Sequence, residues 1–199
     1  MLHTTVGRAA YEVFLQLEFM LKEENDIKRK ALSYYSTWLY EEVTFINKEL
    51  KNKKPMLSKE VLLKKLEDNN RLLNNEFKSF QEEIFRTKKK LRINHPPKWY
   101  SLFDGPDNLK KLAKQTSLKE AHSVLYTGMS AEAHGLKSIT DISKSNKHLD
   151  PIRTSDFALS LILLERNFII TITIKIIMKY LPSEYEDFKH FAFTIFEVE

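Results

Sequence analysis

The sequence contains no cysteine among its 199 residues. This absence excludes a disulfide framework, a cysteine-ligated zinc or iron–sulfur site and a thiol nucleophile. Glycine, with 4 residues, and proline, with 6, are too scarce for a turn-rich β-sandwich, a barrel or a collagen-like repeat. Hydrophobic residues at 42% and charged residues at 30% are typical of a globular protein and argue against a disordered one.

Several common functional motifs are also missing. The sequence has no glycine-rich phosphate loop, no His-Glu-x-x-His zinc motif and no Gly-x-Ser-x-Gly elbow. The 6 histidines are scattered, so we expect neither a protein-built metal site nor a cofactor. A net charge of +5 and a pI near 9.1 favour acidic partners, but they carry no information about the fold.

A single segment, Phe157–Met178, is long enough to cross a bilayer, which takes about 20 apolar residues. Glu165 and Arg166 lie near its middle, and central charges cost roughly 2.5–3.5 kcal/mol each on insertion scales. We therefore interpret this segment as a buried helix and expect no membrane partner. The first ten residues lack the pattern of a signal peptide, so cytoplasmic is the default location.

Apolar residues recur at helical spacing along almost the whole chain, which predicts an all-α fold. We expect a single-domain helical bundle of about six helices over residues 1–199. Ser58 can cap a helix that, if unbroken from Lys59 to Lys90, would form a long antiparallel hairpin with the helix before Pro55. The β-branched run Ile169–Ile177 favours a strand on propensity, but a lone strand among helices has no pairing partner. The chain ends while still apolar, so truncation at either end stays an alternative.

The most specific polar pattern comprises His122, Tyr126, Ser130 and His134, each four residues after the last. On one helix such residues form a row about 18 Å long, too long for a single site, whereas Tyr126 to His134 span about 12 Å. Two interpretations are open: a ligand site around His134, or a cluster of hydrogen bonds that ties helices together.

Arg8 and Glu12 form a second pair, at the i, i+4 spacing of the first predicted helix. They are either an ordinary surface ion pair or groups that face inward and meet the row from Tyr126 to His134.

A run of cations forms a candidate basic patch: Arg86, Lys88, Lys89, Lys90, Arg92 and Lys98. With Trp99 beside it, such a patch can neutralise phosphates and stack on bases. The alternative is a solvated helix end next to a structural tryptophan. We favour this alternative because no nucleic-acid-binding motif accompanies the patch.

Three short motifs give the chain a family resemblance: Gly7-Arg8-Ala9-Ala10-Tyr11-Glu12, Pro97-Lys98-Trp99, and Tyr126-x-x-x-Ser130-x-x-x-His134-Gly135. With these motifs, the chain resembles the bacterial domain-of-unknown-function family numbered 5677 over most of its length. The resemblance implies a compact helical protein with no established activity. It also selects the residues to test, which are Arg8, Glu12, Trp99, Tyr126, Ser130 and His134.

Our leading functional hypothesis is a small polar pocket formed by Arg8, Glu12, Tyr126, Ser130 and His134. It would bind an anionic ligand such as a nucleotide or RNA, with a role in bacterial defence as one setting, and His122 and Trp99 are secondary candidates. A non-catalytic interaction module, either an accessory subunit or a homo-oligomer, is the alternative. A metal-independent nuclease or phosphodiesterase is the second alternative, so the sequence leaves open whether the protein is an enzyme.

Overall fold

The computed structural model describes residues 2–123, 126 and 155–196. The regular elements in this part of the chain are all helical, without any strand, which confirms the all-α prediction. They are α1 (Leu2–Leu21), η1 (Glu24–Asp26), α2 (Ile27–Glu49), α3 (Lys59–Asn74), α4 (Lys78–Leu91), η2 (Trp99–Ser101), α5 (Leu109–Ala113), α8 (Ser155–Tyr180), η3 (Pro182–Glu184) and α9 (Tyr185–Phe196).

Contacts divide the chain into two compact units. Unit 1 combines Met1–Leu21 with Ala113–Glu199, and unit 2 is Lys22–Leu112. The expectation of one domain stays a prediction.

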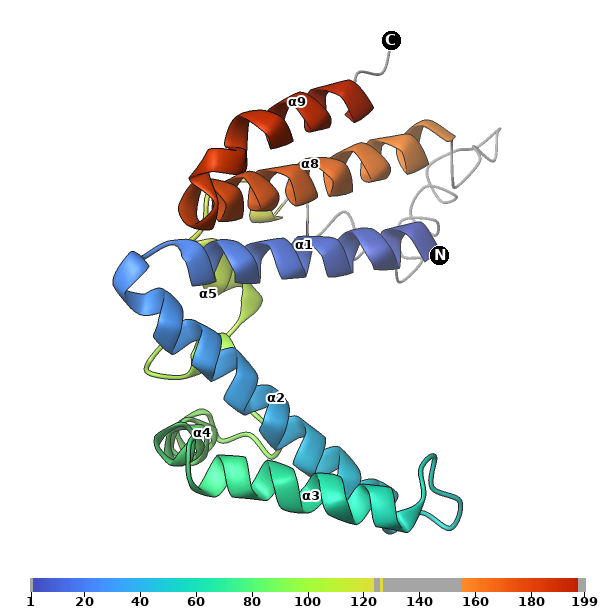
Figure 1. The fold of residues 1–199 in the computed structure, drawn as a ribbon, viewed down its shortest axis with the longest axis vertical. Helices are drawn as coiled ribbons and strands as arrows, with labels where there is room; N and C mark the ends of the chain where they lie inside the picture. The colour runs from blue at the N-terminus through green and yellow to red at the C-terminus, as the bar shows by residue number, and fades with distance from the viewer. Residues whose placement is uncertain (1, 124–125, 127–154, 197–199) are drawn as a thin grey trace, which may run out of the picture. The chain divides into compact units, whose positions relative to one another are not determined.

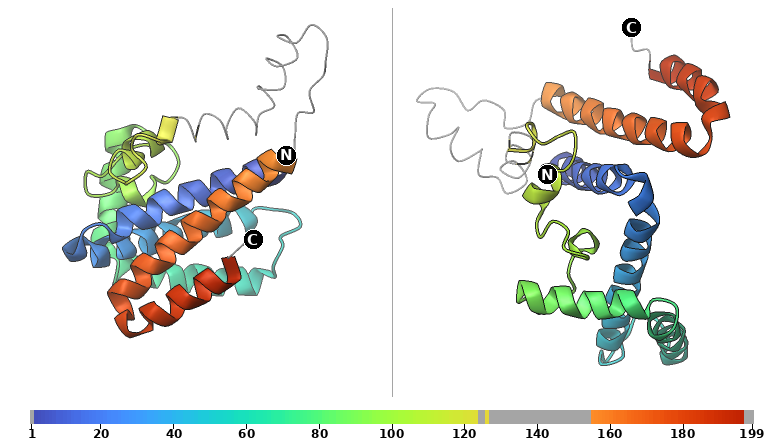
Figure 2. Two further views of the ribbon diagram at one scale, coloured as in Figure 1. Left: turned by 90° about the horizontal axis from the view of Figure 1, so that it is seen from above. Right: turned by 90° about the vertical axis from the view of Figure 1, so that its left-hand side faces the viewer.

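Unit 1 is built around α1 and α8, which lie side by side (Figures 1 and 2). Tyr11 and Phe14 of α1 are buried, as are Phe168 and Ile172 of α8. The rings of Phe14 and Phe168 stack with their centroids 4.6 Å apart. Burying four large side chains along one seam supplies the hydrophobic free energy that holds these two helices together.

The β-branched run Ile169–Ile177 lies within α8, so it is helical as predicted. The expectation that this helix is buried holds for one face only, because Leu159, Ile162 and Ile169 are 55%, 51% and 66% exposed. The packing partners of α8 among the described elements, α1, α9 and η3, leave that face uncovered. None of the helices in the described ranges is long and apolar enough to cross a membrane.

In unit 2, α2 packs against both α3 and α4. One hydrophobic cluster of its core consists of Leu39, Leu73 and Phe77, with Leu32, Val43, Leu72 and Phe80 packed around it. Ser58 caps α3 as predicted, since its Oγ accepts a hydrogen bond from the Val61 amide at 3.4 Å.

The predicted unbroken helix from Lys59 to Lys90 is wrong. α3 ends at Asn74, with Asn75 as its C-cap, and α4 starts at Lys78 and crosses α3 (Figures 1 and 2). The Phe77 amide bonds back to the Leu72 carbonyl at 3.0 Å, which closes the end of α3. The turn lets Phe77 enter the core, where it is 8% exposed. The expected long helix is therefore two shorter helices, α3 and α4, and the long hairpin is not confirmed.

A turn after α4 carries unusual backbone geometry. Phe103 and Asp104 have φ angles of 54° and 61°, a left-handed conformation that costs free energy for residues with a Cβ. Gly105 follows, and a Cβ there would lie 2.0 Å from the Tyr100 carbonyl oxygen. Only glycine fits this position. Because Phe103 and Asp104 are strained, the turn depends on contacts from neighbouring elements.

Candidate functional site

Three polar side chains of α1 share one face, since Arg8, Tyr11 and Glu12 are three and four residues apart. Arg8 Nε donates to Glu12 Oε1 at 3.0 Å. The two side chains are 31% and 35% exposed. The carboxylate therefore fixes one edge of the guanidinium at the boundary between solvent and the interior of unit 1.

Tyr126 holds the same guanidinium from another direction. Arg8 Nη2 donates to the Tyr126 hydroxyl at 2.7 Å. The guanidinium carbon also lies 4.9 Å from the centre of the Tyr126 ring, a cation–π contact. Arg8 is thus held by charge, by a hydrogen bond and by an aromatic ring, which leaves it little rotational freedom.

Two buried rings, those of Tyr11 and His122, support Tyr126 in this position. The His122 ring stacks on Tyr126 at 5.3 Å with an interplanar angle of 19°. The Tyr11 hydroxyl lies 2.6 Å from His122 Nδ1. Burial raises the pKa of Tyr11 to about 12, so its hydroxyl stays protonated and can donate to Nδ1 when His122 carries its proton on Nε2.

The structure therefore brings together Arg8, Glu12 and Tyr126 of the predicted site, with the secondary candidate His122 beside them. Ser130 and His134 fall outside the described residues, so their distance from Arg8 stays a prediction. Tyr11 was not among the predicted site residues. Its position three residues after Arg8, on the same helix face, was the signal that could have found it.

A second polar centre of unit 1 was missed altogether. Glu18 of α1 is 6% exposed. Its Oε1 accepts from Lys175 Nζ of α8, and its Oε2 accepts from the amide and the hydroxyl of Ser117 at 3.1 and 2.9 Å. Residues 117–121 form turns rather than a regular helix, and the Ser117 hydroxyl donates to Glu18. Glu18 thus fixes the segment that leads to Tyr126.

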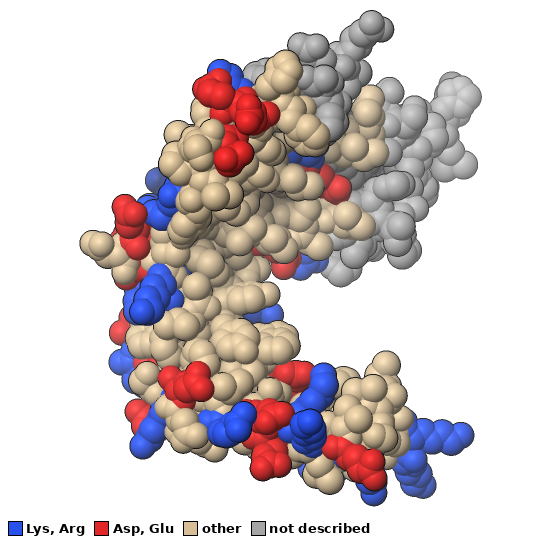
Figure 3. Space-filling model, viewed as in Figure 1, with Lys and Arg blue, Asp and Glu red and all other residues tan. Residues whose placement is uncertain are grey.

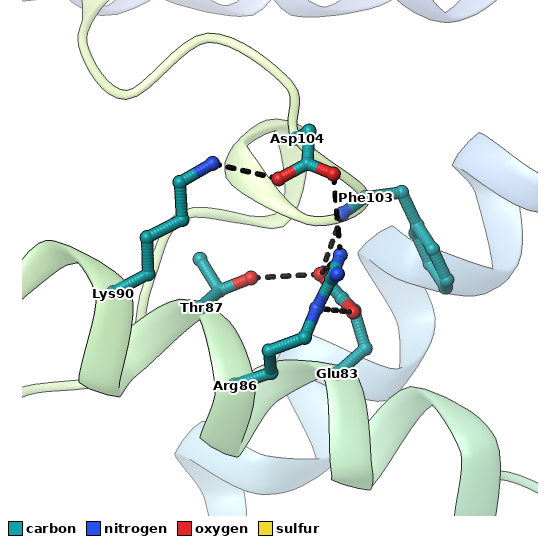
Figure 4. A network of polar contacts seen from close by, with 6 residues as sticks. All are labelled: Glu83, Arg86, Thr87, Lys90, Phe103 and Asp104. Carbon is teal, nitrogen blue, oxygen red and sulfur yellow. Dashed lines mark hydrogen bonds and ion pairs between the residues drawn. The ribbon is translucent and has the colours of Figure 1, made fainter.

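The candidate basic patch lies in unit 2, and two of its six members are engaged by carboxylates (Figure 4). Glu83 accepts from Arg86 Nε at 2.6 Å and Nη2 at 3.0 Å, from Thr87 Oγ1 at 2.8 Å and from the Phe103 amide at 2.8 Å. Asp104 accepts from Lys90 Nζ at 2.6 Å and from Arg86 Nη2 at 3.5 Å. This network clamps the left-handed turn onto α4.

The electrostatics of the network follow from these contacts. Burial by itself would raise the pKa of Glu83, but hydrogen bonds from Arg86, the Phe103 amide and Thr87 outweigh it and lower that pKa. Lys90, followed by Arg86, lowers the pKa of Asp104. Both carboxylates are therefore ionised at neutral pH, and they compensate part of the positive charge of the patch.

The remaining cations of the patch are Lys88, Lys89, Arg92 and Lys98. All are exposed except the half-buried Lys88, and Arg92 ends α4 in a left-handed conformation with φ of 54°. Trp99 is 6% exposed and packs edge-on against Tyr34 and Tyr100. A ring so enclosed cannot stack on a nucleotide base without rearrangement. Within the ranges that the structure describes, no group of three or more His, Asp or Glu side chains is arranged to hold a metal ion.

Comparison with known proteins adds a family. The model of a family of unknown function, DUF5677, matches residues 4–149. The chain belongs to the DUF5677 family. The match spans α1, all of unit 2 and the segment with Tyr126, Ser130 and His134, so it includes every predicted site residue. No curated protein and no solved structure matches the chain.

Proposed function

We propose that this chain binds a phosphate-bearing ligand, a nucleotide or RNA, at the cluster of Arg8, Glu12 and Tyr126, with Ser130 and His134 as further contacts. One observation carries the proposal. The Arg8 guanidinium is held by Glu12 at 3.0 Å and by Tyr126 at 2.7 Å while its side chain is still 31% exposed.

The chemistry of arginine supports this role. A guanidinium has five N–H donors in a planar fork that fits two oxygens of a phosphate. Among the described residues, Glu12 and Tyr126 take one donor each. A cation that is already oriented loses less side-chain entropy on binding than a flexible one, so the fixed geometry favours binding over a merely structural ion pair.

Each residue has a proposed part. Arg8 and His134 contact the phosphate, and Glu12 orients Arg8. The Tyr126 hydroxyl accepts from Arg8 and keeps its own hydrogen, so it and Ser130 donate hydrogen bonds to the ligand. A cytoplasmic location and a role in bacterial defence belong to the same proposal.

The test is a calorimetric titration of nucleotides and short RNAs into the wild type, Arg8→Ala and His134→Ala. Loss of a charge-assisted contact weakens binding about tenfold or more. Arg71→Ala is the matched control, because Arg71 is 69% exposed, pairs with Asp68 and lies in unit 2. Equal affinities for all four proteins would reject the proposal.

An alternative is a non-catalytic interaction module. The same contacts are compatible with it, because they also hold distant segments of the chain together. The bonds from Arg8 to Tyr126 and from Tyr11 to His122 join α1 to a segment more than a hundred residues away. In that case, Ser130→Ala or His134→Ala would lower stability by about 1–3 kcal/mol, because buried partners lose their hydrogen bonds. Unchanged melting together with lost ligand binding would count against this alternative.

A metal-independent nuclease or phosphodiesterase is the third candidate. It requires RNA or phosphodiester cleavage that persists in a chelator and disappears in Arg8→Ala and in His134→Ala while both variants stay folded. Binding without turnover would leave the ligand-binding proposal and remove this one.

A further inference from the structure

The end of unit 2 where α2 meets α3 exposes apolar side chains. This α2–α3 tip consists of residues 48–59, the end of α2, the connecting loop and the start of α3 (Figure 1). Met56 is 83% exposed and Leu57 is 45% exposed. Their exposure costs free energy in water, because neither side chain has covering atoms from the core of the unit.

Lysines surround these two side chains. The tip contains five, all exposed, which are Lys48, Lys51, Lys53, Lys54 and Lys59. None of them takes part in the ion pairs found among the described residues. The carboxylates within and next to the tip are Glu49, which is 9% exposed, and Glu60. Figure 3 shows blue side chains projecting outwards at this end.

The tip also has a defined shape. The buried carboxylate of Glu49 accepts a hydrogen bond from the Met56 amide at 3.0 Å. Asn52 Oδ1 accepts from the Lys54 amide at 3.3 Å, and Ser58 caps α3. The loop is therefore held with Met56 outward, and presenting it costs little conformational entropy.

We propose that the α2–α3 tip docks on the surface of an anionic phospholipid bilayer. Met56 and Leu57 enter the boundary between headgroups and acyl chains, and the five lysines lie among the phosphate and carboxylate headgroups. Binding of a protein segment to a membrane surface grows with the apolar area it buries and with its electrostatic attraction to anionic lipids, and the tip supplies both.

Other partners fit the tip less well. The phosphates of a nucleic acid attract lysines, but they make no favourable contact with exposed aliphatic side chains. Stacking on bases would require aromatic side chains at the tip. A protein interface of standard size buries about 800 Å² on each side and is depleted in lysine. Two exposed aliphatic side chains surrounded by lysines fit a bilayer surface, where anionic headgroups lie next to an apolar interior.

The proposal is independent of the anion site, because the tip lies in unit 2 and Arg8 in unit 1. The proposal departs from the expectation of no membrane partner, which was argued from Phe157–Met178 as a crossing segment.

The first test is co-sedimentation of the full chain with phosphatidylcholine vesicles, with and without phosphatidylglycerol. We expect binding only to the anionic vesicles, weakened by salt. The variant Lys53→Glu/Lys54→Glu should lower the partition coefficient about 30-fold or more, since each lysine contributes about fivefold. Lys28→Glu/Lys78→Glu is the matched control, with the same change in net charge at exposed positions at the starts of α2 and α4, outside both the tip and the basic patch. Equal loss in both variants, or no binding by the wild type, would overturn the proposal.

A second test reports insertion directly. Because the chain has no cysteine, Met56→Cys gives a single attachment point for a polarity-sensitive fluorophore. We expect a blue shift of its emission with anionic vesicles and none for Asn74→Cys, which lies about 22 Å along α3 from the tip. Circular dichroism checks that each variant stays helical. An unshifted label on the Met56→Cys variant, or a tip that binds short RNA instead of vesicles, would refute the assignment.

Discussion

The two units of this chain differ in charge and in what their polar groups do. Unit 2 has 21 Lys and Arg against 14 Asp and Glu, a net charge of +7, whereas unit 1 has 11 against 13, a net charge of −2. The basic character of the protein thus belongs to unit 2 alone, while the proposed anion site lies in unit 1. Long-range attraction of polyanions is therefore a property of unit 2, and binding at Arg8 has to rest on local geometry.

A buried glutamate also joins separate elements in each unit. Glu83 of unit 2 joins α4 to a strained turn, and Glu18 of unit 1 joins α1 to α8 and to Ser117. Glu83 accepts four hydrogen bonds and Glu18 three. In unit 2 the buried carboxylate supports a backbone that is unfavourable by itself, whereas in unit 1 it positions the segment that carries the candidate site.

The largest expected effect is that of Gly105→Ala in unit 2. The new Cβ would meet the Tyr100 carbonyl at 2.0 Å, so the turn has to move. We expect a loss of at least about 3 kcal/mol in the free energy of unfolding, measured by chemical denaturation. Asp104→Gly, which suits the φ of 61° at that position, should cost about 1 kcal/mol or less. A tolerated Gly105→Ala would mean that the turn is not held as described.

Next comes Glu83→Gln, with an expected loss of about 2–3 kcal/mol, because a buried group loses its charge-assisted bonds. Since its pKa is lowered in the fold, the stability that Glu83 contributes is present at neutral pH and is lost as pH falls below the usual range of about 4.5. Hydrogen exchange at acidic pH should show unit 2 opening, and Glu83→Gln should flatten that dependence. The exposed Glu82→Gln is the control, and a matching loss there would contradict the role of Glu83.

In unit 1, Glu18→Gln should cost about 2 kcal/mol, because the ion pair with Lys175 is removed while Ser117 can still donate. Hydrogen exchange should increase in α1 and α8 and stay unchanged in unit 2. Glu186→Gln is the matched control, since Glu186 is 77% exposed. Faster exchange across both units would show that they do not respond separately.

Tyr11→Phe should have a smaller effect, about 1 kcal/mol, from the lost bond to His122. The raised pKa of Tyr11, about 12, means that the unfolded chain releases this proton first as pH rises. Its stabilisation is present below pH about 10 and is lost between there and about pH 12. The variant should lose that alkaline phase, and Tyr180→Phe, 53% exposed, should keep it. An alkaline phase that persists in Tyr11→Phe would point to another group.

The smallest expected effect is on ligand affinity. Glu12→Gln keeps an acceptor for Arg8 but removes a negative charge 3.0 Å from Arg8 Nε. Phosphate affinity should rise by about two- to fivefold in a calorimetric titration. Weaker binding would mean that the charge of Glu12 orients Arg8 more than it repels the ligand.

Local sequence signals predicted much of the fold. The 3.6-residue period gave α1 and α2, and Ser58 marked the start of α3. The break at Asn75–Phe77 was missed, because the apolar spacing continues from Leu73 to Phe77, and the turn that buries Phe77 against Leu39 leaves that spacing unchanged. The spacing of apolar residues along the sequence cannot predict a helix break that depends on tertiary packing.

The candidate site could be predicted from helical spacing only where its residues lie on one helix. The i, i+4 spacing placed Arg8 beside Glu12, and the inward-facing alternative brings Arg8 to Tyr126. Contacts between distant positions, such as Tyr11 with His122 or Glu18 with Lys175, have no periodic signal. They emerge only once α1 packs against α8 and against the segment with His122.

The most direct test of the central claim is an NMR titration of the wild type with a nucleotide, following the Arg8 Nε–H and His134 ring signals together. The account predicts that both signals shift with one common dissociation constant, while the Arg71 Nε–H signal stays in place. Shifts of only one of the two groups, or two different dissociation constants, would show that Arg8 and His134 do not share a ligand and would contradict it.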